Sequence, residues 1–206
     1  MDALALVELS SVARGYRVLD WMVKEAPVTV VEANLVEPGK FLILLGGGVA
    51  EVQAAFDEAL AHAGDTLLDK LLLPGVHERV WQTLAGGEHR GPGWSRLGPG
   101  VFAEPRVDCV GVVEGSTVAS VMEAADRSAK DAGAYLAALR LSPALGGKAY
   151  YVVTGMQHEV EAAVDIGRAV LVSRGRLVDA QVIPNAHDEF LEHLLRPAPF
   201  SARRGD

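Results

Sequence analysis

The sequence is poor in the residue types that build reactive sites. Its 206 residues include one cysteine, Cys109, which excludes an internal disulfide framework and a zinc site made of several cysteines of one chain. No H-E-x-x-H, G-x-S-x-G or P-loop pattern occurs, and the two histidines of "HDEFLEH" (187–193) are too far apart for one helical face. We therefore expect no enzyme activity, no catalytic residue, no metal site and no cofactor.

Basic charge and long apolar runs are also scarce. The chain has 27 acidic and 19 basic residues, a formal net charge of −8, which disfavours non-specific binding of nucleic acid. No apolar run is long enough to span a membrane. The first residues, "MDALALVELSS", have no basic n-region and make a poor signal peptide. We expect a soluble cytoplasmic protein with neither nucleic acid nor a membrane as partner.

What the sequence does contain is an internal repeat. Half of the residues are apolar and 22% are charged, a composition that can bury a core. "LVELSSVARGYRVLDWMVKEAP" (6–27) matches "VVEGSTVASVMEAADRSAKDAG" (112–133). "GKFLILLGGGVAEVQAA" (39–55) matches "GKAYYVVTGMQHEVEAA" (147–163), and "PGVHERVWQTL" (74–84) matches "PNAHDEFLEHL" (184–194). The offset grows only from 106 to 110 residues, as two small loop insertions would produce, so we predict a tandem duplication.

Each copy follows one plan of elements. Apolar strands are expected at about 3–9, 28–33, 40–46 and 65–73 in copy one, and at 107–114, 134–140, 148–154 and 175–183 in copy two. A helix capped by Ser10 or Ser11, or by Ser116 or Thr117, follows the first strand. We expect its apolar face at Val12, Tyr16, Leu19, Val23 and Ala26, or at Val118, Met122, Ala125, Ala129 and Ala132. A second helix begins near Val49 or Gln157, with Val52, Phe56 and Ala59 facing inward in copy one, and a proline, Pro74 or Pro184, opens a short last helix.

The order β-α-β-β-α-β predicts an α+β fold of two tandem ferredoxin-like domains. We place the first domain at 1–85, a Gly/Pro-rich linker without regular structure at 86–106, the second domain at 107–196 and a tail at 197–206. Trp94 and Phe102 suggest that the linker docks on a surface.

The three glycines 46–48 stand between a strand and a helix, an order that also occurs in phosphate-binding turns. Copy two keeps only Gly155 of the three, and Glu51 occupies the third glycine position of G-x-G-x-x-G. A tight turn is therefore favoured over a phosphate site.

Three features together, "ALVELSS…LDWMVKEAPV", "EPGKFLILLGG…EVQAA" and the closing P-x-x-H, resemble the bacterial microcompartment (BMC) shell domain. With two domains in unpermuted order, the chain is similar to the trimeric tandem-domain shell proteins, those of the propanediol-utilisation compartment in particular. The resemblance implies a structural protein of the microcompartment shell. Its homotrimers would form pseudohexamers that tile with other shell hexamers and pentamers around a central pore for metabolites.

The resemblance also implies which residues line that pore. The turn between the second and third strands of each domain would face the axis. In this chain these turns comprise Glu37, Pro38 and Gly39, and Ser142, Pro143, Ala144 and Leu145. Three Glu37 carboxylates near one axis would favour a cation, a hard metal ion or a polar metabolite; the alternative is that Glu37 points into bulk solvent.

A second set of residues matches the tile edge of the family. Lys24 and Lys130 correspond to the edge lysine, and Asp20 and Asp126 precede them by one helical turn. His77 and His187 are expected at the edge or at the helix start rather than as ligands. The alternative for the lysines is an ordinary solvated position.

Two departures limit the resemblance. Single-domain relatives often carry P-R-P-H before the last helix, whereas this chain has Gly75 and Asn185 at the arginine position, so docking at that corner is expected to be weaker or to use other residues. The propanediol-type relatives place a cysteine in the pore turn, where three of them hold an iron–sulfur cluster. Glu37 stands there in this chain, so no cluster is expected. A ferredoxin-like module that binds or senses a small molecule remains the alternative function.

Overall fold

The structure, a computed structural model, describes residues 2–84, 96–98, 101–102, 107–141 and 145–194. The first copy contains four strands and three α-helices. They run in the order β1 (Ala3–Leu9), α1 (Val12–Glu25), β2 (Thr29–Val36), β3 (Lys40–Gly47), α2 (Val49–Ala63), β4 (Leu67–Pro74) and α3 (Glu78–Leu84), with a single 3-10 turn at Gly64–Thr66 before β4.

The second copy repeats this order. It consists of β7 (Cys109–Gly115), α4 (Val118–Asp131), β8 (Tyr135–Leu141), β9 (Ala149–Gly155), α5 (Gln157–Ser173), β10 (Leu177–Pro184) and α6 (Asp188–Leu194). Every strand and helix expected from the sequence is present, with ends that differ by a few residues.

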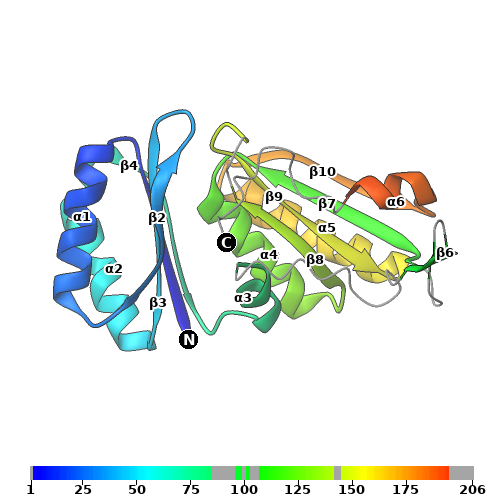
Figure 1. Ribbon diagram of the computed structural model, residues 1–206, viewed down its shortest axis with the longest axis horizontal. Coiled ribbons are helices and arrows are strands. Elements are labelled where there is room, and N and C mark those ends of the chain that lie inside the picture. The colour runs from blue at the N-terminus through cyan, green and yellow to red at the C-terminus, as the bar shows by residue number, and fades with distance from the viewer. Residues whose placement is uncertain (1, 85–95, 99–100, 103–106, 142–144, 195–206) are drawn as a thin grey trace.

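The two sheets have the same topology. Their strand orders are β2-β3-β1-β4 and β8-β9-β7-β10, and all neighbouring strands are antiparallel. This is the order of a ferredoxin-like split βαβ fold, so the predicted fold class is confirmed. In each copy two helices cover one face of the sheet, α1 and α2 in copy one and α4 and α5 in copy two (Figure 1).

Strand β1 is buried on both of its faces, which is unusual for an antiparallel sheet. Residues Ala3, Ala5, Val7 and Leu9 pack with α1 and α2, whereas Leu4 and Leu6 belong to a cluster that includes residues of α4. We call the side that carries Leu4 and Leu6 the outer face of the first sheet. The second copy covers this face, which explains why "ALALVEL" lacks polar alternation.

The prediction for the buried face of the first helix was right for Ala26, which is buried, and for Val12 and Leu19, which pack half-buried against the core, but wrong for Tyr16 and Val23. In α1 the buried residues are Gly15, Val18 and Met22, whereas Tyr16 and Val23 are 59% and 41% exposed. In α4 the predicted Val118, Met122 and Ala125 are buried as expected. The apolar stripe of α1 is wider than its own sheet can cover, because part of it corresponds to the α4 surface that contacts the other copy.

The predicted cap of the first helix is confirmed, whereas the last helix of each copy begins later than predicted. The hydroxyl of Ser11 caps α1 by accepting from the backbone N–H of Arg14 at 3.3 Å. Pro74 and Pro184 end strands but do not open helices. A residue with positive φ follows each proline, Gly75 at 81° and Asn185 at 49°, and the helices begin only at Glu78 and Asp188.

Two further segments bear on the predictions. The linker 86–106, expected to lack regular structure, contains a short antiparallel ribbon of β5 (Arg96–Gly98) and β6 (Val101–Phe102); Trp94 and the tail 197–206 lie outside the described residues. The turn at Gly48 is filled by its own helix, since a Cβ there would lie 2.4 Å from the Glu51 carboxylate. That carboxylate at the start of α2 supports the tight turn rather than a phosphate site.

Candidate functional site

The largest contact between the two copies is the packing of α4 on the outer face of the first sheet (Figure 1). Helix α4 packs against its own sheet on one side and against β4 and β1 on the other. Nine of its fourteen residues are consequently buried, including the polar Ser120, Asp126 and Ser128. Buried polar groups need partners, and three sets of contacts supply them at this junction.

The first set centres on Glu8, which is 1% exposed. Its carboxylate accepts from the backbone N–H of Ala119 at 2.7 Å, in the first turn of α4, and lies 3.5 Å from Lys40 Nζ. Burial raises the pKa of Glu8, while the hydrogen bond from Ala119 and the charge of Lys40 act in the opposite direction. The equivalent pair in copy two, Glu114 and Lys148, is 3.0 Å apart, with side chains that are 34% and 47% exposed.

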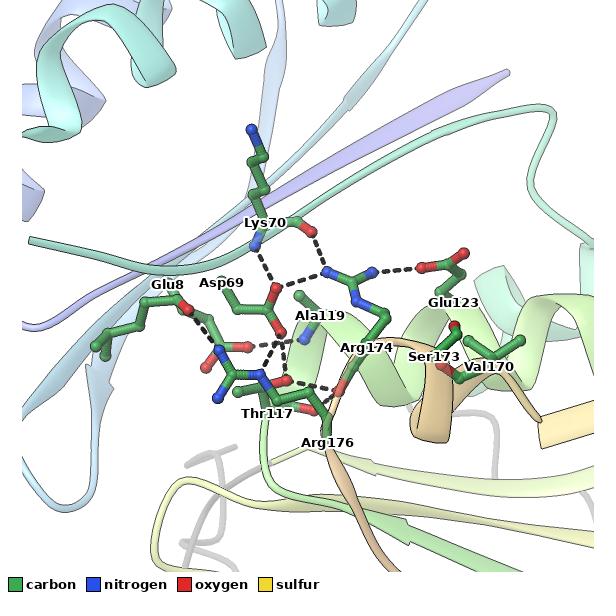
Figure 2. A network of polar contacts seen from close by, with 12 residues as sticks. Glu8, Asp69, Lys70, Thr117, Ala119, Glu123, Val170, Ser173, Arg174 and Arg176 are labelled. Atoms are coloured by element: carbon green, nitrogen blue, oxygen red, sulfur yellow. Dashed lines mark hydrogen bonds and ion pairs between the residues drawn. The ribbon is translucent and has the colours of Figure 1, made fainter. Parts of the chain in front are cut away.

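The second set surrounds Asp69 of β4 (Figure 2). The Thr117 hydroxyl and the Arg174 guanidinium, at 2.5 Å, donate to its carboxylate, and Arg176 Nε lies 3.8 Å away. Arg174 also donates to the carbonyl of Lys70 at 2.7 Å and pairs with Glu123. A buried carboxylate of copy one is thus neutralised by two arginines of copy two.

The third set brings three predicted edge residues together. Asp126, 2% exposed, accepts from the backbone N–H of His77 at 2.7 Å, and Lys130 donates both to Asp126 and to the carbonyl of Gly75. This corner therefore ties α4 to the chain reversal that follows β4.

The other three predicted edge residues are not brought together within one chain. Asp20 and Lys24 pair on α1 at 2.7 Å, and His187 lies before α6 at the opposite end of the molecule (Figure 1). Both histidines accept a backbone N–H through Nδ1, His77 from Arg79 and His187 from Glu189. They lie at helix starts, as the sequence indicated.

The turn at Glu37, Pro38 and Gly39 lies beside residues 145–147, the described part of the equivalent turn in copy two (Figure 1). Glu37, Pro38 and Gly39 form an exposed turn between β2 and β3, in which Gly39 has a φ of 99°. Lys40 Nζ donates to the carbonyl of Gly147 at 3.4 Å, in the equivalent turn of copy two. Leu145 is half-buried at the start of that turn, and Ser142, Pro143 and Ala144 lie outside the described residues.

Cys109 lies away from these turns. It is buried at the start of β7, opposite Gly155, whereas the pore turn joins the other ends of the strands. Burial, followed by the nearby charge of Asp108, raises the pKa of the thiol. The described part of the chain contains no group of three or more His, Cys, Asp or Glu side chains arranged to hold a metal ion. Among its helices, none is long and apolar enough to cross a membrane.

A hollow of about 450 Å³ lies between α3, the end of α4 and the strands β8 and β9. Arg79 forms part of the wall of this hollow. The Arg79 guanidinium donates to the carbonyl of Leu136 and lies over the ring of Tyr135. This is the place where a small-molecule module of the alternative kind would bind its ligand.

Sequence reasoning missed the Asp69 network. Its residues come from segments about 105 positions apart, and the arginines stand in the turn whose two extra residues were read only as a loop insertion. A signal for the junction was nevertheless available. Glu8 and Glu114 are acidic residues inside otherwise apolar strands, and such residues need a partner.

Comparison with known proteins gives consistent similarities. The BMC domain family model matches residues 3–76 and 109–186. The chain is 33% identical over 194 residues to the bacterial microcompartment shell protein PduT of Citrobacter freundii, covering 94% of this chain and 98% of that protein.

Solved structures agree with these similarities. A microcompartment protein of Desulfitobacterium hafniense superposes with a TM-score of 0.75 at 33% identity, over 93% of this chain and 99% of that one. A fused permuted hexameric shell protein from the RMM microcompartment has a TM-score of 0.56 at 19% identity, over 83% and 84% of the chains, and supports the fold alone.

Proposed function

The chain belongs to the BMC-domain family and is a structural shell protein of a bacterial microcompartment with two tandem domains; from this premise we propose that three copies close into a pseudohexameric ring around a central pore. The family membership favours this role over the ligand-sensing alternative. The ring would tile with other shell proteins, hexamers and pentamers, into the shell facet.

The junction within the chain joins the outer face of the first sheet to helix α4 of copy two. The ring is supported by the equivalent surfaces, helix α1 and the outer face of the second sheet, which are covered only in part. Helix α4 packs on the outer face of sheet one. The equivalent helix, α1, exposes Tyr16, whose counterpart Met122 is fully buried in α4. On the equivalent outer face of sheet two Val110 is buried in a cluster that includes Leu191 of α6, but Val112 and Tyr150 at the border of this cluster remain half-exposed.

A helix of one copy that packs on the sheet of the next makes a head-to-tail contact, and repeated contacts of this kind form a ring when the rotation between neighbours closes. If the junction within the chain is repeated between chains, six domains in three chains would surround one axis, which is the assembly that the resemblance to trimeric tandem-domain shell proteins implies.

The test is the mass of the purified protein in solution. We expect three times the chain mass of 21.8 kDa, and we expect Tyr16→Asp to give monomers because it places a charge in the contact. Val49→Asp is the matched control, since Val49 is 48% exposed and begins α2, which packs within copy one. A monomeric wild type, or a trimer that persists in Tyr16→Asp, would contradict the ring.

For the pore we propose that Glu37, Pro38 and Gly39, together with Ser142, Pro143, Ala144 and Leu145, form the rim through which metabolites pass. The contact between Lys40 and Gly147 supports this, because it holds the two turns next to each other. In shells that contain Glu37→Gln we expect faster passage of anionic metabolites and slower passage of cations. Unchanged flux of both would contradict the role of Glu37.

For the tile edge we propose Lys24 and Lys130, supported by their position on equivalent helix ends and by side chains that are 69% and 37% exposed. Asp20, Asp126, His77 and His187 would order the chain around them. Replacing both lysines by alanine should leave the trimer intact and suppress two-dimensional sheets in electron micrographs. Sheets that form unchanged would exclude this edge.

A further inference from the structure

Asp69 and Asp179 occupy the same position in the two copies. In the strand registers, Glu8 lies opposite Asp69 and Glu114 lies opposite Asp179, in each case next to a shift in register. Both aspartates also accept the backbone N–H of the following residue at 2.8 Å. The local backbone therefore presents both carboxylates in the same way, on the outer face side of the fourth strand.

Their surroundings differ sharply. Asp69 is 8% exposed and is held by Thr117, Arg174 and Arg176 of the other copy. Asp179 is exposed, and its hydrogen bonds among the described residues come from Ala180 and the Gln181 side chain, both within two positions. Asp69 is thus paired with arginines of the other copy at the junction within the chain. Within one chain, no arginine or lysine among the described residues of the other copy makes such a pair with Asp179.

In the proposed ring, helix α1 of a neighbouring chain would approach Asp179. This helix carries arginines, whereas in copy two the arginines stand in the turn before the fourth strand. Thr117, Ser120 and Glu123 of α4 correspond to Ser11, Arg14 and Arg17 of α1, by the constant offset of 106 residues. The hydroxyl of Ser120 lies 2.5 Å from that of Thr117, which donates to Asp69. Arg14 therefore corresponds to a residue that lies inside the network.

The turn before the fourth strand differs in the opposite sense: here copy two has arginines and copy one has none. In copy two it carries Arg174 and Arg176, whereas in copy one it reads Gly-Asp-Thr at 64–66. Each copy thus has two arginines close to its junction surface, on the turn in copy two and on the helix in copy one. Such an exchange preserves charge complementarity with an acidic partner while changing the element that supplies the cation.

We infer that Arg14 of one chain pairs with Asp179 of the partner subunit, in the place that Arg174 and Asp69 occupy within the chain. The inference rests on the proposed trimer and names the charge pair at its subunit interface. Arg14 is available for this contact: it is exposed, and its guanidinium makes one long hydrogen bond, 3.4 Å, to the carbonyl of His62. Arg17 is more committed, since it lies 4.6 Å from the ring centroid of Trp21.

The neighbouring contacts of the junction fit the same docking. Glu8 accepts from Ala119, so Glu114 of the partner subunit would accept from the N–H of Ala13, which also lies in the first turn of its helix. The within-chain junction is additionally secured by the covalent connection. The junction between chains lacks that connection, so its charge pair should weigh more heavily on assembly.

The test compares trimer dissociation on dilution for charge-reversed variants of the full chain. Arg14→Asp and Asp179→Arg should each raise the concentration at which the trimer dissociates by about tenfold or more, because each places like charges together. The double variant, which restores opposite charges, should return close to the wild-type value. Arg127→Asp and Asp165→Arg are the controls, since both residues are exposed on the second copy and neither corresponds to a junction residue.

Circular dichroism checks that each variant folds, and Arg14→Ser, which copies Ser120, gives a milder version of the same change. If the wild type is a trimer and either reversal leaves its dissociation unchanged, or the double variant is no tighter than the single ones, the pairing is wrong and the ring stands. If the wild type forms no trimer, the ring itself fails.

Discussion

The two domains have one fold but fill their cores differently. In copy one, Phe41 of β3 packs over Gly15 of α1, where a Cβ would lie 2.3 Å from its ring. In copy two the equivalent residues are Ala149 and Val121. The large side chain has moved from the strand to the helix. Because protein interiors are close-packed, a smaller residue on the strand requires a larger residue on the helix. The two differences offset each other in volume, so both copies can keep the same backbone.

A second exchange adds polar groups to the core of copy two. Tyr151 is fully buried, and its hydroxyl lies 2.8 Å from that of Ser128, which donates to the carbonyl of Ala163. The ring fits because residue 167 is glycine. The corresponding residues of copy one are Ile43, Met22 and Ala59, all of them apolar and buried. Complete hydrogen bonding makes the polar version tolerable, and burial raises the pKa of Tyr151 well above its ordinary value.

The largest change in stability is expected when the packing of Phe41 on Gly15 in copy one is removed. Phe41→Ala should lower the free energy of unfolding by about 3–5 kcal/mol, because it leaves a cavity above Gly15. Gly15→Val in the same chain should recover part of the loss, since it recreates the arrangement of copy two. Urea unfolding of both variants measures this. A double variant less stable than Phe41→Ala would show that the two cores do not exchange volume in this way.

A smaller effect is expected from Gly167→Ala. The new Cβ would lie within 3.0 Å of the Tyr151 hydroxyl, and overpacking of this kind costs about 1–3 kcal/mol. Tyr151→Phe in the same chain should relieve the clash, because it removes the nearest atom. Ala59→Gly, the matched change in copy one, should cost about 1 kcal/mol from helix propensity and packing. Thermal unfolding compares the three, and a Gly167→Ala variant as stable as wild type would refute the packing argument.

The smallest effect concerns Glu8 and the pH. Burial raises the pKa of Glu8 in the folded chain above the ordinary value of 4.5. At a pH between 4.5 and the raised pKa, Glu8 therefore holds its proton more strongly in the folded chain than in the unfolded chain. The contribution of Glu8 to stability is therefore fully present below about pH 4.5 and is lost as the pH rises through the folded value.

Denaturant unfolding of wild type and Glu8→Gln across this range measures the effect. The stability of wild type relative to the variant should fall as the pH increases from 4.5. Glu114→Gln is the control, because the Glu114 side chain is 34% exposed whereas Glu8 is buried, and the stability difference between wild type and this variant should depend less on pH. A Glu8 difference that stays constant with pH would contradict the raised pKa.

The sequence alone determined the duplication, the order of strands and helices and the fold class, because these depend on local periodicity, turn residues and similarity between the copies. It also placed Glu37 and Gly39 in a turn, and His77 and His187 at helix starts. It could not assign the faces of α1. Tyr16 and Val23 are as apolar as the buried Val18 and Met22, and only the packing of two domains distinguishes them.

The tertiary structure decided how the copies meet. Arg174 and Arg176 follow Asp69 by 105 and 107 residues, and no local pattern pairs them with it; only the seating of α4 on the first sheet brings the charges together in a buried place. The same seating explains why Glu8 is buried and Glu114 is only half-buried, although both stand in equivalent strands. Periodicity reports which residues can share a face, whereas burial depends on what that face is packed against.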